Sequence, residues 1–396
     1  MVRLFEQKKD CCGCLACKNV CPKQAVTVKP DENGFIYPQI NEELCIECGL
    51  CDKVCDFKKA TVDGNIPLYT YAAINKNKRV LANSASGGAF GALANFVFNR
   101  GGVVFGCAYD DKMYPKHVCI DNLAYLEKIQ GSKYVQSDID DTYIQAENYL
   151  KNGKWVLFTG TPCQIAGLKA YLRKDYDRLI TIDLICHGVP SVSFFKGYIR
   201  YLEGKYKGEI INFKFRDKSK GWGLISEVVY KKHSKILNRV IYPVESYYYT
   251  YFLNGDIYRE SCYECKYAGK VRVGDFTIGD YWGVEKVHPE INTKNGVSVL
   301  LVNSQKGSMI AGELANYLYL TESSFEQAKI YNAQLNSPVK KSLNREAIFK
   351  TWREGGYRAV AKKYYKANKW KIIFARVKRL IPNPVKKYLK KMIKRG

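Results

Sequence analysis

The residues most clearly suited to bind metal are two runs of cysteines near the start of the chain. Each run has the spacing C-x2-C-x2-C-x3-C, and the second repeats the first at an offset of 34 residues. Thiolates at this spacing bind cubane 4Fe-4S clusters, because three close cysteines hold one cube while the fourth reaches the other. The sequence therefore predicts one cluster on Cys11, Cys14, Cys17 and Cys55, and another on Cys45, Cys48, Cys51 and Cys21.

The spacing is that of bacterial two-cluster ferredoxins, and it argues against zinc as the alternative metal. A structural zinc site is usually built from two separated ligand pairs, and a third cysteine two residues on crowds a single tetrahedral ion. Short apolar runs at 26–28 and 35–40 predict strands between the cysteine loops. The pattern departs once, because Asp56 follows Cys55 where a proline is usual. Cys12 is interpreted as a packed thiol outside both ligand sets.

Four more cysteines occupy the ends of predicted elements further along the chain. Cys163 follows the apolar strand 155–158 and a Gly160-Thr161-Pro162 turn, in which the threonine caps a helix and the proline opens it. Cys186 follows a predicted strand at 179–185, and a CxxC at Cys262 and Cys265 precedes the strand 276–278. Four thiolates are the number that a third cubane or a zinc ion takes.

A competing interpretation makes Cys163 a reactive nucleophile, because a helix N-terminus favours a thiolate. None of the four histidines (His117, His187, His233 and His288) stands out in the sequence as its base. Cys107 and Cys119 have no motif around them, and we interpret them as small core residues.

Strands that alternate with amphipathic helices predict an α/β body behind the cysteine repeat. Ser86-Gly87-Gly88 precedes an apolar stripe that runs from Phe90 to Phe98 with helical spacing. The free N–H groups at such a helix start are suited to an anion, so a cofactor phosphate is expected there. The alternative is that the two glycines only punctuate the backbone.

Together these motifs resemble the beta-subunit family of coenzyme F-420-reducing hydrogenases and dehydrogenases, which are flavin and iron-sulfur proteins. The matching stretches are Ser86-Gly87-Gly88-Ala89, Gly131 to Val135, Gly160 to Gln164, Cys186 to Pro190, Cys262 with Cys265, and Gly279 to Gly283. The resemblance implies FAD at the glycine turns and a 4Fe-4S centre in the body. The residues expected to bind the flavin are Ser86, Gly87, Gly88, Lys133, Tyr134, Gly160, Thr161, Pro162, Gln164 and Asp280.

Two residues in the matching stretches are expected to act in catalysis. Lys133 is suited to pair with a flavin phosphate or ring oxygen. His187, beside a predicted cluster ligand, is suited to relay a proton, with a hydrogen-bonded structural histidine as the alternative.

The predicted protein is an iron-sulfur flavoprotein oxidoreductase. Its expected parts are an α+β ferredoxin-like module at 1–60, an α/β flavin-binding body at 66–150 and 151–345, and an amphipathic helical tail at 346–396. Electrons from a redox partner protein or a small-molecule donor are expected to pass between the clusters and FAD. The expected substrate is the deazaflavin coenzyme or another small metabolite, including one of surface-polysaccharide synthesis. The alternatives are a non-catalytic electron-transfer subunit of a larger complex and a polysaccharide-pathway scaffold.

The amino-acid composition excludes several further classes of protein. With 46% hydrophobic residues the chain is able to bury a core, which excludes disorder. Cysteines at ligand spacing and the lack of a signal-peptide or membrane-spanning pattern predict a cytoplasmic protein. Lys and Arg exceed Asp and Glu by 25, but residues 355–396 hold 15 of the basic residues and no acidic one. The body is therefore ordinary in charge, and no nucleic-acid partner is predicted.

The basic tail has the pattern of two short amphipathic helices. The first carries Trp370, Ile373, Phe374, Val377, Leu380 and Ile381 on one face, and the second, behind Pro382-Asn383-Pro384, carries Val385, Tyr388, Leu389, Met392 and Ile393. Apolar stripes beside lysines and arginines are typical of interfacial membrane anchors. The sequence thus predicts peripheral attachment to an anionic inner membrane surface. The alternative is a tail that packs on the body or stays solvated.

Overall fold

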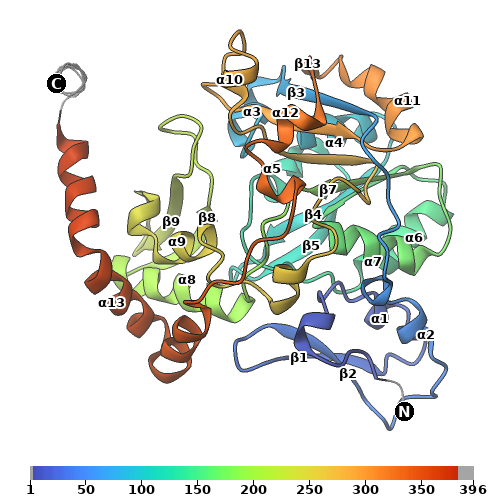
Figure 1. Ribbon diagram of the computed structural model, residues 1–396, viewed down its shortest axis with the longest axis horizontal. Helices are drawn as coiled ribbons and strands as arrows, with labels where there is room; N and C mark the ends of the chain where they lie inside the picture. The colour runs from blue at the N-terminus through green and yellow to red at the C-terminus, as the bar shows by residue number, and fades with distance from the viewer. Residues whose placement is uncertain (1–2, 382–396) are drawn as a thin grey trace.

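The computed structural model describes residues 3–381 (Figure 1). Its N-terminal segment consists of short elements that alternate with the cysteine loops. They are η1 (Lys8–Asp10), α1 (Ala16–Asn19), β1 (Val26–Pro30), β2 (Ile36–Ile40), α2 (Leu50–Lys53) and η2 (Asp56–Lys58). β1 pairs antiparallel with β2, with Val26 opposite Ile40. The predicted strands and the ferredoxin-type arrangement are thus confirmed for this segment.

The body is built on an eight-stranded sheet with the order β13-β3-β12-β11-β7-β6-β4-β5. The strands are β3 (Tyr69–Asn75), β4 (Val103–Tyr109), β5 (Pro115–Ile120), β6 (Val156–Gly160), β7 (Leu179–Leu184), β11 (Phe276–Asp280), β12 (Ser298–Val302) and β13 (Leu318–Ser323). Strands β4, β6, β7 and β11 run parallel, and the outer strands join antiparallel. Segments 66–150 and 151–345 both contribute strands to this one sheet.

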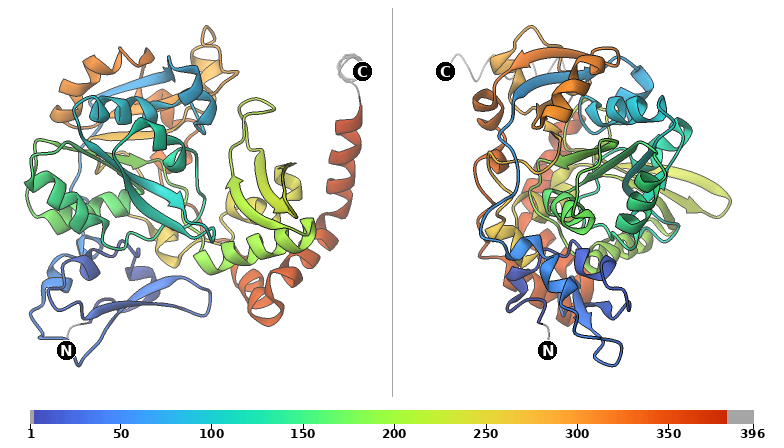
Figure 2. Two further views of the ribbon diagram at one scale, coloured as in Figure 1. Left: turned by 180° about the vertical axis from the view of Figure 1, so that it is seen from behind. Right: turned by 90° about the vertical axis from the view of Figure 1, so that its right-hand side faces the viewer.

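Helices cover both faces of the sheet, which explains why its central strands β6 and β7 are almost wholly buried. They are α3 (Lys78–Asn83), α4 (Ala89–Phe98), α5 (Leu126–Ile129), α6 (Thr142–Lys151), α7 (Pro162–Leu172), α10 (Val284–Val287), α11 (Gln305–Leu314) and α12 (Phe325–Lys329), with the single turns η3 (Leu123–Tyr125), η5 (Glu260–Glu264) and η6 (Ala333–Leu335). One core lies under α4 and α11, and another lies under α6 and α7. Ala16 and Val54 of the N-terminal segment join the second core, so this segment packs below α7 (Figures 1 and 2).

An aromatic layer that the sequence analysis did not predict lies beside the sheet. It contains α8 (Val192–Tyr206), the antiparallel strands β8 (Glu209–Lys214), β9 (Ser226–Lys232) and β10 (Lys235–Ile241), η4 (Pro243–Glu245) and α9 (Tyr247–Leu253). Its buried core includes Phe194, Phe195, Tyr198, Phe213 and Tyr248. The mixed α/β class is confirmed, with this second sheet as an addition to it.

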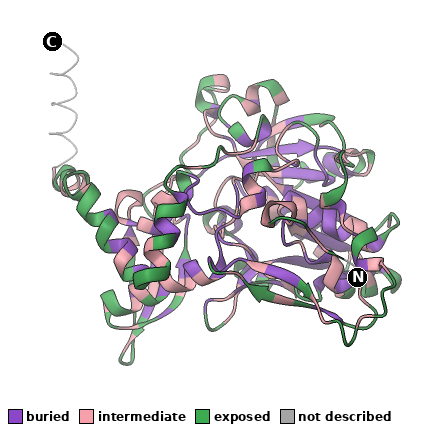
Figure 3. Ribbon diagram, turned by 60° about the horizontal axis from the view of Figure 1, so that its bottom comes forward, coloured by how far each residue is buried: buried purple, intermediate pink, exposed green. Residues whose placement is uncertain are grey.

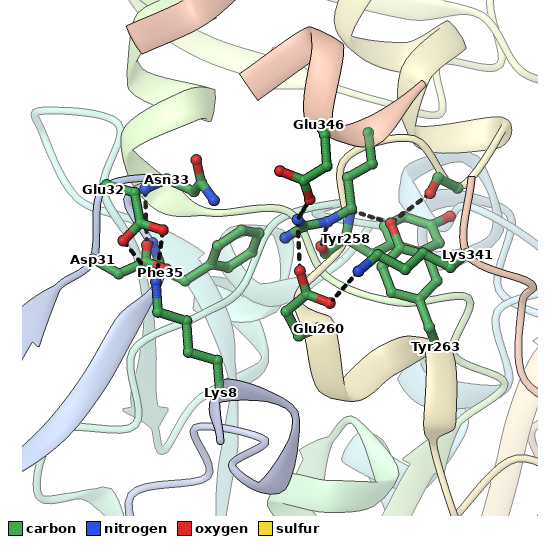
Figure 4. Close-up of polar contacts among 12 residues, drawn as sticks. Lys8, Asp31, Glu32, Asn33, Phe35, Tyr258, Glu260, Tyr263, Lys341 and Glu346 are labelled. Carbon is green, nitrogen blue, oxygen red and sulfur yellow. Dashed lines mark hydrogen bonds and ion pairs between the residues drawn. The ribbon is translucent and has the colours of Figure 1, made fainter. Parts of the chain in front are cut away.

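The described part of the chain ends in a long helix, α13 (Arg345–Leu380), which bends at Gly356, where φ is 63°. Its start is anchored by Arg345, whose Nη1 lies 2.7 Å from Glu260 and whose Nε donates to the Tyr258 carbonyl at 3.0 Å. Figure 4 shows Glu260 also paired with Lys341, at 3.0 Å, and Lys8 between Asp31 and Glu32. Beyond the bend the helix runs alongside the aromatic layer, on the side away from the eight-stranded sheet (Figure 2).

Candidate functional site

The eight N-terminal cysteines gather in the two predicted sets. A cavity of about 30 Å³ is lined by Cys11, Cys14, Cys17 and Cys55, which we call thiol set one. A second cavity, of about 20 Å³, is lined by Cys21, Cys45, Cys48 and Cys51, which we call thiol set two. Cys51 also reaches the wall of the first cavity, so the two sets adjoin.

The internal repeat explains how the backbone wraps each set. Leu15 and Gly49, at equivalent positions of the repeat, both have left-handed backbones, with φ of 61° and 69°, and each begins a short helix. Gly13 and Glu47 form a second equivalent pair, with φ of 70° and 51°. A left-handed backbone conformation is costly for residues other than glycine. Their repetition therefore indicates that the same tight loop is built twice.

The two sets differ in exposure. Cys48 of thiol set two is exposed, as are the neighbouring Leu44 and Ile46. Thiol set one faces the body, and burial raises the pKa of Cys55 to about 11. Asp56, the residue that replaces the usual proline, is buried and accepts a hydrogen bond from the Tyr267 hydroxyl at 2.7 Å. This departure from the ferredoxin pattern therefore docks the segment on the body.

Cys163, Cys186, Cys262 and Cys265 come together as a third group, the body thiol set. Cys163 lies in the first turn of α7, Cys186 follows β7, and Cys262 lies in η5 with Cys265 directly behind it. Burial, together with the charge of Cys265, raises the pKa of Cys262 to about 12. Burial, and then the charges of Cys262, Cys163 and Cys265, likewise raise the pKa of Cys186. All four thiols are thus near enough to interact.

A buried carboxylate holds the CxxC segment at the end of β7. Asp183 accepts hydrogen bonds from the backbone N–H groups of Val273 and Gly274, at 3.0 and 2.8 Å, and pairs with Arg272. Arg272 in turn donates to the Tyr267 carbonyl at 3.1 Å. This network brings residues more than seventy positions apart in the sequence to one edge of the sheet. Within residues 3–381, no three His, Cys, Asp or Glu side chains are gathered tightly enough for a single metal ion.

The main cavity, of about 360 Å³, opens at the carboxyl ends of β4, β6, β7 and β11. Ligands bind at this edge in open α/β sheets, and the volume lies in the range of ligand sites. Predicted residues in its wall are Ser86, Gly88, Lys133, Tyr134, Gly160, Thr161, Cys163, Gln164, Cys186, His187 and Asp280. Gly87 and Pro162, predicted to touch the cofactor, and the thiols of Cys262 and Cys265 are not among its lining residues.

One end of the main cavity is the start of α4. Gly88 caps the helix with φ at 84°, and the first turn of α4 carries no acidic residue. Gly87 approaches the sheet so closely that a Cβ would lie 2.0 Å from the Ala73 carbonyl oxygen. Lys218 fixes this loop by donating to the carbonyls of Leu81 and Ser86, at 2.8 and 2.6 Å. A rigid helix N-terminus therefore faces the cavity, as an anion site requires.

An ion pair that sequence reasoning missed borders the cavity at the end of β11. Arg216 binds Asp280 through two hydrogen bonds, of 2.6 and 3.0 Å. Trp222 donates to the same carboxylate at 2.9 Å and stacks on Trp282, with ring centroids 4.9 Å apart. Asp280, predicted as a cofactor contact, thus holds Arg216 in place. Arg216 belongs to no motif, and its loop gives no signal that would have found it.

A buried polar network at β5 and β6 forms part of the wall of the main cavity. His117 contacts the Thr159 carbonyl through Nε2 at 2.8 Å and Ser137 Oγ through Nδ1 at 3.0 Å. Burial lowers the pKa of His117 to about 4, so the ring is neutral at pH 7 and Nε2 carries the proton that the carbonyl accepts. Gln164 donates to the same Ser137 hydroxyl at 3.1 Å. His117 escaped notice because it lies in an edge strand without a motif.

Lys133 lies in the cavity wall with its ammonium group drawn toward the protein. Its Nζ donates to the carbonyls of Gln130 and Lys128, at 2.8 and 3.2 Å, and burial lowers the pKa of Lys133 to about 8. Burial also lowers the pKa of His187. Thr159 Oγ1, also in the wall, is buried and has no hydrogen-bond partner within residues 3–381. An unsatisfied buried hydroxyl is what a polar ligand would complete, so the cavity is suited to a ligand with polar groups.

Comparison with known proteins confirms the resemblance that the motifs indicated. Residues 153–328 match the family model for the C-terminal part of the coenzyme F420 hydrogenase/dehydrogenase beta subunit, and residues 10–59 match the 4Fe-4S dicluster domain. A curated component of the F(420)H(2) dehydrogenase of Methanosarcina mazei is 22% identical over 191 residues, which cover 46% of this chain and 54% of that protein. The chain thus spans about half the length of this relative.

Two further similarities are more limited. An uncharacterized ferredoxin of Methanocaldococcus jannaschii is 44% identical over 46 residues, which cover 12% of this chain and 25% of that protein. A chain of the F420-reducing [NiFe] hydrogenase complex from Methanosarcina barkeri is 14% identical, with 75% of this chain and 97% of that one covered and a TM-score of 0.46.

Proposed function

Because the chain joins a 4Fe-4S dicluster domain to a C-terminal domain of the coenzyme F-420 hydrogenase/dehydrogenase beta-subunit family, we propose that it is an iron-sulfur flavoprotein oxidoreductase. One observation carries this proposal: Cys163 and Cys186 belong both to the body thiol set and to the wall of the main cavity. A cluster ligand set and a nucleotide-sized cavity that share residues are suited to electron exchange between two cofactors.

Each cofactor has a set of residues suited to hold it. Thiol sets one and two supply eight ligands for two cubanes, and the body thiol set supplies four for a third. For FAD, the start of α4 offers N–H groups to a phosphate, and the polar wall from Gly160 to Gln164 offers contacts to the rest. When bound, a flavin supplies exchange of one or two electrons, which links one-electron clusters to a two-electron substrate.

The charged residues of the cavity have distinct proposed roles. With a pKa of about 8, Lys133 is largely protonated at pH 7 and adds positive charge next to the cofactor. His187 is neutral at pH 7, because burial lowers its pKa, and is therefore able to accept a proton in the cavity. Arg216 lies in the wall of the cavity and is held in place by its ion pair with Asp280. Because His187 is neutral and Asp280 balances Arg216, Lys133 is the residue of these three that favours an anionic substrate.

The proposed substrate is the deazaflavin coenzyme or another small anionic metabolite, including one of surface-polysaccharide synthesis, and the proposed electron donor is a redox protein. The Methanosarcina mazei relative is named as a subunit of an F(420)H(2) dehydrogenase. Turnover of the isolated, cluster-loaded chain tests this proposal. We expect repeated reduction of the deazaflavin coenzyme with a chemical reductant under anaerobic conditions. A single stoichiometric reduction of the protein without turnover would favour the alternative, a non-catalytic electron-transfer subunit.

For the tail, we propose attachment to an anionic membrane surface. Within residues 3–381, no helix is long and apolar enough to span a membrane. One face of the outer part of α13 packs on the body, because Ile372 is buried and Glu245 pairs with Arg376 and Arg379. The opposite face is exposed (Figure 3), and it carries Trp370, Phe374, Val377 and Leu380, with Trp370 77% and Leu380 83% exposed. The second predicted helix, with Val385 to Ile393, lies outside the described residues.

We expect the full-length chain to co-sediment with anionic vesicles and not with zwitterionic ones. Each buried aromatic side chain contributes about 1.5–3 kcal/mol, so the double variant Trp370→Ser/Phe374→Ser is expected to bind at least about tenfold more weakly. Moderate salt is expected to weaken binding of the native chain, because its attraction to the lipids is partly electrostatic. A chain that ends at Tyr364 is expected to keep its cofactors and lose vesicle binding.

The matched control for this experiment is Tyr319→Ser/Ile330→Ser, which removes two side chains of similar exposure from other surfaces. We expect this control to bind vesicles as the native chain does. Equal sedimentation of the native chain and the tail variants would refute the anchor.

A further inference from the structure

The N-terminal segment and the body meet where thiol set one lies closest to the body thiol set. Helix α7 begins beside Cys163, and its Gly167 faces Cys14 so closely that a Cβ would lie 2.9 Å from Cys14 Cβ and 3.0 Å from its sulfur. Only glycine fits this contact without a shift of the neighbouring chain. One turn of a single helix therefore separates a ligand of the body set from a neighbour of set one.

Cys12 fills the space between the two sets. The side chain is buried, lies in the walls of both the thiol-set-one cavity and the main cavity, and interacts with the thiols of Cys14 and Cys163, which raise the pKa of Cys12. Sequence analysis placed Cys12 outside both ligand sets, and the structure gives it a bridging position between them. A buried side chain thus joins the two sets.

Arg259 is a fully buried cation at this junction. Its Nε donates to the Cys11 carbonyl at 2.7 Å, and Nη1 donates to the Ile36 carbonyl at 2.9 Å and to Gln136 Oε1 at 3.1 Å. Nη2 lies 3.7 Å from the Cys11 sulfur. The guanidinium carbon lies 4.0 Å from the centre of the Tyr37 ring. Two backbone carbonyls, a neutral amide and a thiol ligand therefore surround the charge.

The groups that respond to this charge include members of two ligand sets. Those that favour the cation most are Cys11, Tyr37, Cys12 and Cys262, so Arg259 acts on both thiol set one and the body thiol set. A Cβ at Gly13 would lie 3.0 Å from the guanidinium carbon, which means that the cysteine loop is shaped around the arginine. Burial of a charge without a carboxylate partner is costly, and such a charge interacts strongly with its neighbours.

We propose that Arg259 is a positioning residue that docks the N-terminal segment on the body and raises the reduction potential of a cluster held by thiol set one. The proposal rests on the proposed function, because it requires the clusters to be bound. Adding an electron makes a cluster more negative, so a fixed nearby cation stabilises the reduced form. Thiol set two lies at the exposed end, where water screens charge. The charge therefore favours electrons on the inner cluster, next to the body.

The test is an anaerobic redox titration of the full-length chain, followed by electron paramagnetic resonance. In Arg259→Gln, the midpoint potential of one ferredoxin-type signal is expected to fall while the other keeps its value. The falling signal is identified as the one that Cys17→Ser removes. Arg259→Lys keeps the charge, so its midpoint is expected to stay nearer the native value even though it loses hydrogen bonds and melts at a lower temperature.

A second variant keeps the test decisive if Arg259→Gln fails to fold. Gln136→Glu has the same shape and places a carboxylate beside the guanidinium, so it is expected to lower the same midpoint with Arg259 still present. The control is Lys58→Gln, which removes a half-exposed cation whose charge also acts on Cys55. Water screens that charge, so the expected shift is much smaller.

Unchanged midpoints in a variant that keeps its full iron content would overturn the role of Arg259 and leave the proposed function intact. Absence of clusters from the native chain would instead overturn the proposed function. Iron content, measured on every sample, separates these two failures.

Discussion

Cys265→Ser is expected to remove about a third of the iron and sulfide of the anaerobically purified chain, from about twelve of each to about eight. The remaining eight belong to thiol sets one and two, which lie in a separate segment with their own ligands. Cys265 is absent from the wall of the main cavity, so flavin is expected to stay bound. Iron, sulfide and flavin are measured on the same sample.

Cys119→Ser is the matched control for this loss, because Cys119 lies in the edge strand β5 and belongs to none of the three thiol sets. We expect the control to keep about twelve iron atoms. If Cys265→Ser keeps as much iron as the native chain, the body thiol set binds no iron-sulfur cluster. A native chain with about eight iron atoms and one zinc would support the alternative metal for the body set.

Gly88→Asp is expected to abolish flavin binding and leave the iron content unchanged. Gly88 caps α4 at the end of the main cavity, and a carboxylate there would repel the phosphate that the helix N-terminus attracts. The residue has a left-handed backbone, with φ at 84°, and a Cβ would lie 2.9 Å from Asn75 Cβ. Any substitution therefore also strains the loop.

Gly88→Asn separates charge from strain, because asparagine has the size of aspartate and tolerates the left-handed region equally well. We expect this variant to retain a large fraction of the flavin, which is measured by its fluorescence after release from the protein. Equal flavin loss in both variants would attribute the effect to strain. Full retention in Gly88→Asp would move the phosphate site away from α4.

Cysteine spacing made most of the metal chemistry predictable from the sequence. Ligands such as Cys11 and Cys45 are grouped locally, and the repeat assigns each to its partner set. The body thiols were harder, because Cys163 and Cys265 come from distant segments that only the sheet order brings together. Cys163 was found by its position after a strand, where parallel strands deliver residues to a common edge, and Cys265 by its CxxC spacing with Cys262.

The rest of the site depends on tertiary contacts that leave no local pattern. Arg216, His117 and Arg259 lie in segments without motifs, and each matters through a partner distant in the sequence. The aromatic layer was missed for a similar reason. One of its strands, Lys235–Ile241, is largely exposed, so its alternation is weak.

The amphipathic pattern of the tail was recognised from the sequence. Which face of the helix packs on the body and which is exposed was not. Periodicity grouped Ile373 with Trp370 and Phe374, whereas Ile372 is the residue that packs on the body. One face of this helix contacts protein and the other exposes aromatic residues. A single stripe of apolar residues in the sequence does not show which face is which.

The central claim, three iron-sulfur clusters and one flavin in a single chain, is tested most directly by the cofactor content of the full-length protein purified without oxygen. We predict about twelve iron atoms, about twelve sulfides and about one FAD per chain. About eight iron atoms with no flavin would contradict the claim and leave a ferredoxin segment attached to a body without redox cofactors.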